Sequence, residues 1–115
     1  MTKHPTFFCD IDGTIFKYRK FETYLDTDVE VLPGVVESMQ NWFESGAHIV
    51  LTTARPEALR AHTISELESH GIPYHQLVMG IGRAERYLIN DSEEIGVKRA
   101  IAIPLDRNTG FNFKI

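Results

Sequence analysis

The fold of this chain is decided by one stretch near its start, residues 7–17, which reads Phe7-Phe8-Cys9-Asp10-Ile11-Asp12-Gly13-Thr14-Ile15-Phe16-Lys17. A short apolar run ends in two carboxylates, Asp10 and Asp12, and a glycine follows at once. This pattern predicts a buried strand that stops at a polar site. Because alternate side chains leave a strand on the same face, the two carboxylates start out pointing the same way.

Two carboxylates this close repel each other. A hard cation such as Mg²⁺ relieves the repulsion and keeps coordination positions free for a phosphate oxygen. Gly13 lets the backbone turn sharply and approach a ligand closely. The plainer alternative is a polar turn after a strand, since Asp and Gly are common turn residues.

At this point the sequence resembles the haloacid dehalogenase (HAD) superfamily, whose first motif is an apolar strand followed by Asp-x-Asp-Gly-Thr, matched by Asp10 to Thr14. The resemblance implies that Asp10 attacks phosphorus and that Asp12 acts as acid and base. The residue types suit this chemistry, because one carboxylate can form an aspartyl-phosphate and the other can protonate the leaving alkoxide and then activate water. In the family, an acidic residue at position 12 indicates a phosphatase rather than a dehalogenase.

Length and composition indicate a small globular protein. A chain of 115 residues fits one domain, 1–115, without a separate cap domain. The net charge of −4 disfavours nucleic acid as a partner. Cys9 is the only cysteine, which excludes an internal disulfide and favours a reducing compartment. With no signal peptide or apolar membrane span in the sequence, we expect a soluble, cytoplasmic protein that does not bind membranes.

The expected fold class is α/β, a three-layer Rossmann-like fold with a central, mainly parallel β-sheet. After the first strand, the predicted elements are a flap at about 15–31, a helix over 34–45, a strand over 48–51, a helix over 57–70, and strands over 75–79, 87–91 and 100–103. The stripe predicted to be buried on the second helix is Ala58, Ala61, Ile64 and Leu67. The segment between the strands expected at 75–79 and 87–91, which contains residues 82–85, is too short for a helical crossover, so either a loop spans the sheet edge or one strand runs antiparallel.

The second predicted strand ends in hydroxyl residues, Thr52 and Thr53. The carboxyl ends of parallel strands meet at one sheet edge, so these hydroxyls are expected beside the two aspartates. The family's second motif is a Thr or Ser here that binds the phosphoryl group; Thr53 fits it, and Thr52 is the near alternative. Arg55 could reach the same phosphate or pair with the flap, and the predicted phosphate-binding set is Thr53, Thr52, Gly13 and Arg55. Thr53 could also simply cap the following helix.

The family's third motif is a lysine, and this chain has none between Lys20 and Lys98. Arg83 in its glycine-bordered turn is the preferred substitute, since an arginine keeps the charge and adds a forked donor set. Arg86, expected to face outward, and Lys98 are the alternatives.

The family's fourth motif is a strand ending in acids that complete the Mg²⁺ shell, and the sequence offers Asn90-Asp91 after an apolar run. The predicted metal ligands are therefore Asp10, Asp12, Asp91 and Asn90. An Asn-Asp-Ser sequence is also a turn and helix-cap signal in its own right.

Together these motifs predict a Mg²⁺-dependent hydrolase of a small phosphate monoester. By analogy with small lidless members of the family, the substrate could be a sugar phosphate of a surface-polysaccharide or nucleotide-sugar pathway. An open site would either admit large substrates or be covered by a second subunit of a homo-oligomer. The main rival is a catalytically weak relative that binds a phosphorylated ligand or a partner enzyme. A phosphorylation-receiving signalling domain is disfavoured, because it needs an Asp where this chain has Thr52 and Thr53.

Overall fold

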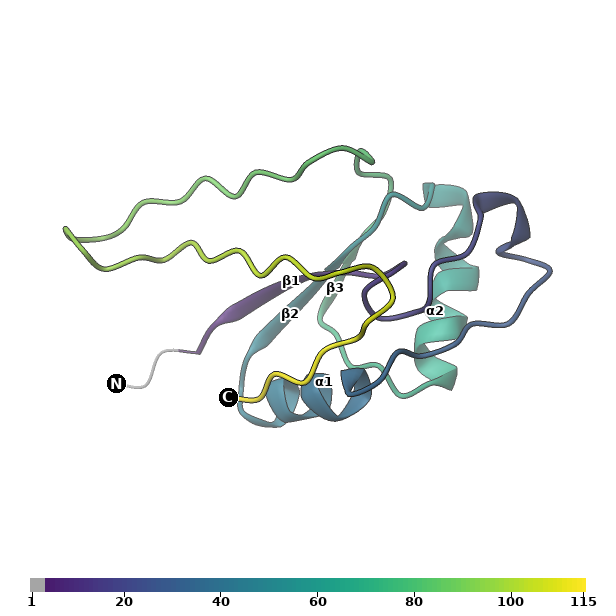
Figure 1. Ribbon diagram of the computed structural model, residues 1–115, viewed down its shortest axis with the longest axis horizontal. Coiled ribbons are helices and arrows are strands. Elements are labelled where there is room, and N and C mark those ends of the chain that lie inside the picture. Colours follow the sequence, from purple (N-terminus) through teal and green to yellow (C-terminus); the bar gives the residue numbers. More distant parts are fainter. Residues whose placement is uncertain (1–3) are drawn as a thin grey trace.

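The computed structural model describes residues 4–115, apart from the side chain of Phe21 (Figure 1). Three strands form a parallel sheet in the order β1 (Thr6–Asp10), β2 (His48–Thr52) and β3 (Gln76–Val78). In the register of β1 and β2, Cys9 lies opposite Leu51 and Asp10 opposite Thr52. The predicted α/β fold with a parallel sheet is confirmed.

Two helices connect the strands, α1 (Val35–Glu44) between β1 and β2, and α2 (Arg60–Ser69) between β2 and β3. A 3-10 turn, Glu57–Leu59, leads into α2. Val35, Met39 and Trp42 recur at helical spacing in α1 and are buried, whereas Phe43 is 46% exposed. The hydrophobic core is one cluster to which both helices and the first two strands contribute. Its members include Met39 and Trp42 from α1, Leu67 from α2, Cys9 from β1, and Ile49 and Leu51 from β2. No helix of residues 4–115 is long and apolar enough to cross a membrane.

The buried face of α2 differs from the predicted stripe. Ala58 and Ala61 are exposed, whereas Thr63, Glu66 and Leu67 are buried. The helix turns polar side chains inward because they face a buried arginine, described below. Apolar periodicity alone could not reveal this, since the buried partner lies on another element.

After β3 the chain leaves the sheet, and residues 82–105 form an extended excursion, here called the arm, seen in green to yellow in Figure 1. The strands predicted over 87–91 and 100–103 are therefore wrong. Both segments are irregular, and Ile89 in the first and Ile101 in the second are 91% and 75% exposed. A strand needs a hydrogen-bonding partner, and within residues 4–115 only β2 pairs with β1, so neither arm segment forms a ladder with the free edge of β1.

The C-terminal tail returns from the arm to α1 (Figure 1). Trp42 stacks between Phe7 and Phe111, with ring centroids 3.9 Å and 5.3 Å away. Gly110 lies so close to Pro33 that a side chain there would collide with the Pro33 carbonyl, and its φ of +74° also favours glycine. The tail is thus fixed to the start of α1, which positions residues 106–109 beside the first motif.

Candidate functional site

The first motif builds a tight turn at the end of β1. The backbone amides of Thr14, Ile15 and Phe16 all donate to the Ile11 carbonyl, at 3.1, 2.8 and 3.1 Å. Gly13 adopts a φ of +89° in this turn, a conformation that side chains rarely allow. As a result Asp10 and Asp12 line the same polar pocket of about 330 Å³. The sequence prediction that the two carboxylates come together agrees with this geometry.

The two aspartates differ in their surroundings. The Asp10 side chain is 31% exposed, and its Oδ2 accepts a hydrogen bond from the Thr14 hydroxyl at 3.0 Å. The Asp12 side chain is only 10% exposed, and both of its oxygens accept hydrogen bonds from Arg55 at 2.8 Å. Asp10 is therefore the carboxylate open to a ligand, and Asp12 is the one held in place by the protein.

Arg55 takes a different position from the phosphate contact suggested by the sequence. Its side chain is completely buried and donates to Asp12, to the Thr63 hydroxyl at 3.0 Å and to Glu66 at 2.6 Å. Burial alone lowers the pKa of the guanidinium, but the hydrogen bonds and charges of Asp12 and Glu66 outweigh it and raise that pKa. The guanidinium is directed at protein carboxylates, so Arg55 acts on a ligand only through Asp12.

The flap is closed at its base by backbone hydrogen bonds and carries a tyrosine to the acid pair. The amide of Lys17 donates to Glu30, and the amide of Leu32 donates to Ile15. The Tyr24 hydroxyl donates to Asp12 Oδ2 at 3.1 Å. Burial, followed by the charge of Asp12 and this hydrogen bond, raises the pKa of Tyr24 to about 12. Position in the sequence predicted a flap beside the site, but nothing in the sequence indicated Tyr24.

The two threonines at the end of β2 have different environments. Thr53 lines the polar pocket, and its hydroxyl accepts a hydrogen bond from the Arg55 amide at 3.1 Å, a local turn contact. The alternative that Thr53 caps the following helix is wrong, because that helical segment begins after Pro56 and has no side-chain cap. Thr52 lines the apolar cavity described below and not the polar pocket. Between the two residues predicted from the sequence, the structure brings Thr53 to the acid pair.

Besides Arg55, three arginines line the polar pocket: Arg83, Arg86 and Arg107. Arg86 donates to Asp10 Oδ1 at 3.1 Å, so the expectation that it faces outward is wrong. Arg83, the preferred substitute for the missing lysine, also lines the pocket. The structure thus brings both arginines to the site, and Arg86 is the one that bonds Asp10.

Arg107 comes from the tail, in which no functional residue was predicted. Its guanidinium lies over the Tyr18 ring, 4.2 Å from the centroid, and its side chain packs over Gly13. The neighbouring Asn108 holds the tail in place, because its amide donates to the Gly13 carbonyl at 2.9 Å and its side chain accepts from the Tyr18 amide at 2.7 Å. Because Tyr18 and Asn108 are 90 positions apart, no local sequence pattern could predict this contact.

The fourth predicted motif does not reach the acid pair in this structure. Asp91 lies exposed on the arm, where Arg99 donates to it at 3.2 Å, and Asn90 donates to Asp91. The described residues 4–115 contain no group of three or more His, Cys, Asp or Glu side chains that could hold a metal ion. As arranged here, the donor set does not fit the predicted Mg²⁺ site, because the irregular arm keeps Asp91 and Asn90 away from Asp10 and Asp12.

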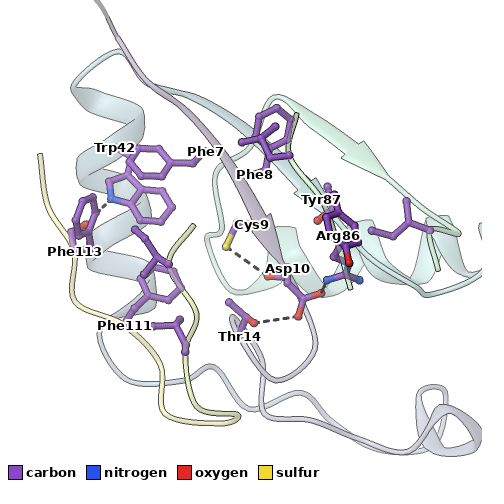
Figure 2. A pocket seen from close by; sticks show the side chains of 15 residues that line it. Phe7, Phe8, Cys9, Asp10, Thr14, Trp42, Arg86, Tyr87, Phe111 and Phe113 are labelled. Atoms are coloured by element: carbon purple, nitrogen blue, oxygen red, sulfur yellow. Dashed lines mark hydrogen bonds and ion pairs between the residues drawn. The ribbon is translucent and has the colours of Figure 1, made fainter. Parts of the chain in front are cut away.

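A second, apolar cavity of about 510 Å³ adjoins the polar pocket along the free edge of β1. Figure 2 shows Asp10, Thr14 and Arg86 at one end of it, and the rings of Phe7, Trp42, Phe111 and Phe113 on the opposite side. The cavity also borders Cys9, whose pKa is raised to about 12 by burial and by the negative charge of Asp10. The thiol is therefore protonated at neutral pH and has no nucleophilic role.

Comparison with known proteins gives a family and a fold. The family model described as PITM 1-3, LNS2 domain matches residues 7–95. The crystal structure of a target protein from Vibrio cholerae is similar with a TM-score of 0.52 and 20% sequence identity, covering 79% of this chain and 82% of that chain. At that identity the likeness supports the Rossmann-type α/β fold alone. No curated protein matches the sequence.

Proposed function

Because this chain belongs to the PITM 1-3, LNS2 domain family, which is HAD-like and phosphatase-related, we propose that it is a phosphohydrolase acting on a phosphate monoester. One observation carries this proposal: the open carboxylate of Asp10 faces a polar pocket bordered by Arg83, Arg86 and Arg107. Arginine is well suited to bind phosphate, because its planar fork of donors matches two phosphate oxygens.

In the proposed reaction, Asp10 attacks phosphorus and forms an aspartyl-phosphate while the ester oxygen leaves. Asp12 first takes up a proton from solvent and gives it to the leaving oxygen, and its carboxylate then takes a proton from the water that hydrolyses the intermediate. Arg86, and Arg83 beside it, stabilise the negative charge that builds on the phosphoryl oxygens. Thr53 and the backbone at Gly13 are the proposed phosphate contacts.

The finer features of the proposal come from the sequence. We propose a single, lidless domain that takes small phosphorylated substrates, such as sugar phosphates, in the cytoplasm, with a second subunit as the candidate cover of the open site. A requirement for Mg²⁺ stays a prediction, and no step above depends on it. Its assay is turnover with and without a chelator.

A second function is favoured by one specific contact. Both oxygens of Asp12 are engaged by Arg55, and one also accepts from Tyr24, which holds Asp12 as a paired carboxylate. A site arranged in this way suits binding of a phosphorylated ligand without turnover. The same three arginines would then act as the binding residues.

The proposal is tested with p-nitrophenyl phosphate and a panel of sugar phosphates, with and without Mg²⁺. We expect the purified protein to hydrolyse at least one ester and Asp10→Asn to remove turnover while the circular dichroism spectrum is kept. Arg86→Ala is expected to lose more activity than Arg83→Ala, roughly tenfold or more, because Arg86 contacts Asp10 directly.

The result can contradict each part separately. Full turnover by the Asp10→Asn variant would exclude Asp10 as the nucleophile. No turnover by the wild type, with inorganic phosphate still bound and Arg86→Ala weakening that binding, would replace the phosphohydrolase by the binding function.

A further inference from the structure

A buried chain of four charged side chains runs from the acid pair to α2 and back to the flap. In order, Asp12 pairs with Arg55, Arg55 pairs with Glu66, and Glu66 pairs with Arg19. The nitrogen to oxygen distances along the chain are 2.8, 2.6 and 2.8 Å, and none of the four side chains is more than 10% exposed. Two cations alternate with two carboxylates, so the cluster is neutral as a whole.

Glu66 is the only member of this chain of charges that lies on α2, and it connects two otherwise separate arginines. Its Oε1 accepts from Arg55 and its Oε2 from Arg19, while His62 lies 3.3 Å from the same Oε2. One carboxylate therefore fixes the arginine that holds Asp12 and the arginine that belongs to the flap.

Tyr24 closes the cluster on the flap side. Both guanidinium groups lie over its ring, with the Cζ of Arg55 4.4 Å and the Cζ of Arg19 5.1 Å from the ring centroid, within the range of cation–π contact. Its hydroxyl bonds Asp12, and Arg19 donates to the carbonyls of Tyr24 and Thr27. The flap is thus fastened to the same charges that orient Asp12.

Such a cluster adds little net stability to a fold. Buried ion pairs lose about as much in desolvation as they gain in attraction, and apolar side chains of similar volume are often as stable. The cluster does, however, orient the Asp12 side chain. The two hydrogen bonds from the Arg55 guanidinium fix the plane of the Asp12 carboxylate, and Glu66 in turn holds that guanidinium in place.

We propose that Glu66 is a positioning residue, which orients the Asp12 carboxylate through Arg55 and couples it to the flap through Arg19. This inference rests on the proposed function, in which Asp12 moves the proton of the leaving group. Misplacing a catalytic group by about 1 Å can cost on the order of a hundredfold in rate. Loss of Glu66 should therefore impair proton transfer rather than substrate binding.

The test compares Glu66→Gln with Glu68→Gln, the same substitution at an exposed position of the same helix. Two esters of similar shape serve as substrates, phenyl phosphate and p-nitrophenyl phosphate. Phenolate is the poorer leaving group and needs the proton more. For Glu66→Gln we expect kcat for phenyl phosphate to fall roughly tenfold or more, a smaller fall for p-nitrophenyl phosphate, and little change in KM. Glu68→Gln should match the wild type.

Two further variants separate positioning from general damage to the fold. Glu66→Asp keeps the charge but draws the carboxylate back by one methylene, so it should fold and show the same dependence on the leaving group to a lesser degree. In an Asp12→Asn background, Glu66→Gln should cause no further loss, because the residue acts through Asp12. An independent further loss in that background would overturn the proposal.

A measurement that does not depend on turnover can test the positioning role of Glu66 independently of the proposed function. The Nε–H of Arg55 is buried and bonded to Asp12, so its proton NMR signal should exchange slowly with water and disappear in Arg55→Lys. Glu66→Gln should shift or broaden that signal, and Glu68→Gln should leave it unchanged. If neither ester is hydrolysed but the signal responds in this way, the phosphohydrolase proposal fails and the positioning stands. An unchanged signal in Glu66→Gln overturns the positioning.

Discussion

Replacing Arg55 by methionine should destabilise this protein more than any surface substitution of the same kind. The Arg55 side chain is 0% exposed and gives hydrogen bonds to Asp12, Thr63 and Glu66. Methionine fills much of the same space but leaves two carboxylates, each only 10% exposed, without their shared cation. Removing one partner of a buried ion pair costs about 3–5 kcal/mol.

That magnitude is a large part of the total stability of a small domain, about 5–15 kcal/mol. At roughly 4 °C per kcal/mol for a chain of this size, the melting temperature should fall by about 12–20 °C. Urea unfolding gives the free energy directly, and the fluorescence of Trp42, the single tryptophan, reports it because this ring is buried between Phe7 and Phe111.

Arg60→Met is the matched control. Arg60 pairs with Glu57 at 2.5 Å on the surface, with side chains 39% and 66% exposed, and solvent screens such exposed pairs so strongly that they add little to stability. Adding Asp12→Asn to Arg55→Met removes the carboxylate that has lost its arginine and should recover part of the loss, whereas Glu66 keeps its pairing with Arg19. Equal losses for Arg55→Met and Arg60→Met would refute the reasoning, since they would mean that the buried carboxylates do not depend on Arg55.

Two further predictions follow from the raised pKa values. The pKa of Cys9 is raised to about 12 by burial and Asp10, so at pH 8 Ellman's reagent should modify the thiol very slowly in the native protein and fully after unfolding; fast native labelling would contradict its burial. The pKa of Tyr24 is raised to about 12, so an absorbance titration should show one of the four tyrosines ionising last, and Tyr24→Phe should remove that step. Because the folded pKa lies above the ordinary value of 10, the stabilisation linked to Tyr24 should be complete below about pH 10 and decline towards pH 12; its persistence above that pH would count against the contact with Asp12.

The sequence predicted well the features that depend on neighbouring residues. The apolar run before Asp10 and the glycine after Asp12 are local, and they specify a strand, a turn and an adjacent pair of carboxylates wherever the chain packs. The sequence likewise predicted a helix over 34–45, which the structure has as α1 (Val35–Glu44). Predictions failed for the arm, because the apolar runs at 87–91 and 100–103 carry strand propensity but a strand exists only when another strand pairs with it.

What the sequence by itself determined is therefore the acid pair, the parallel α/β framework and the chemistry that two carboxylates beside a phosphate can perform. Only the tertiary structure decided how those carboxylates are held. Arg55, Glu66 and Tyr24 lie 43, 54 and 12 positions from Asp12 in the chain, and Arg107 is further still. Their charges act over a few ångströms in a buried environment, and only folding brings them within that distance.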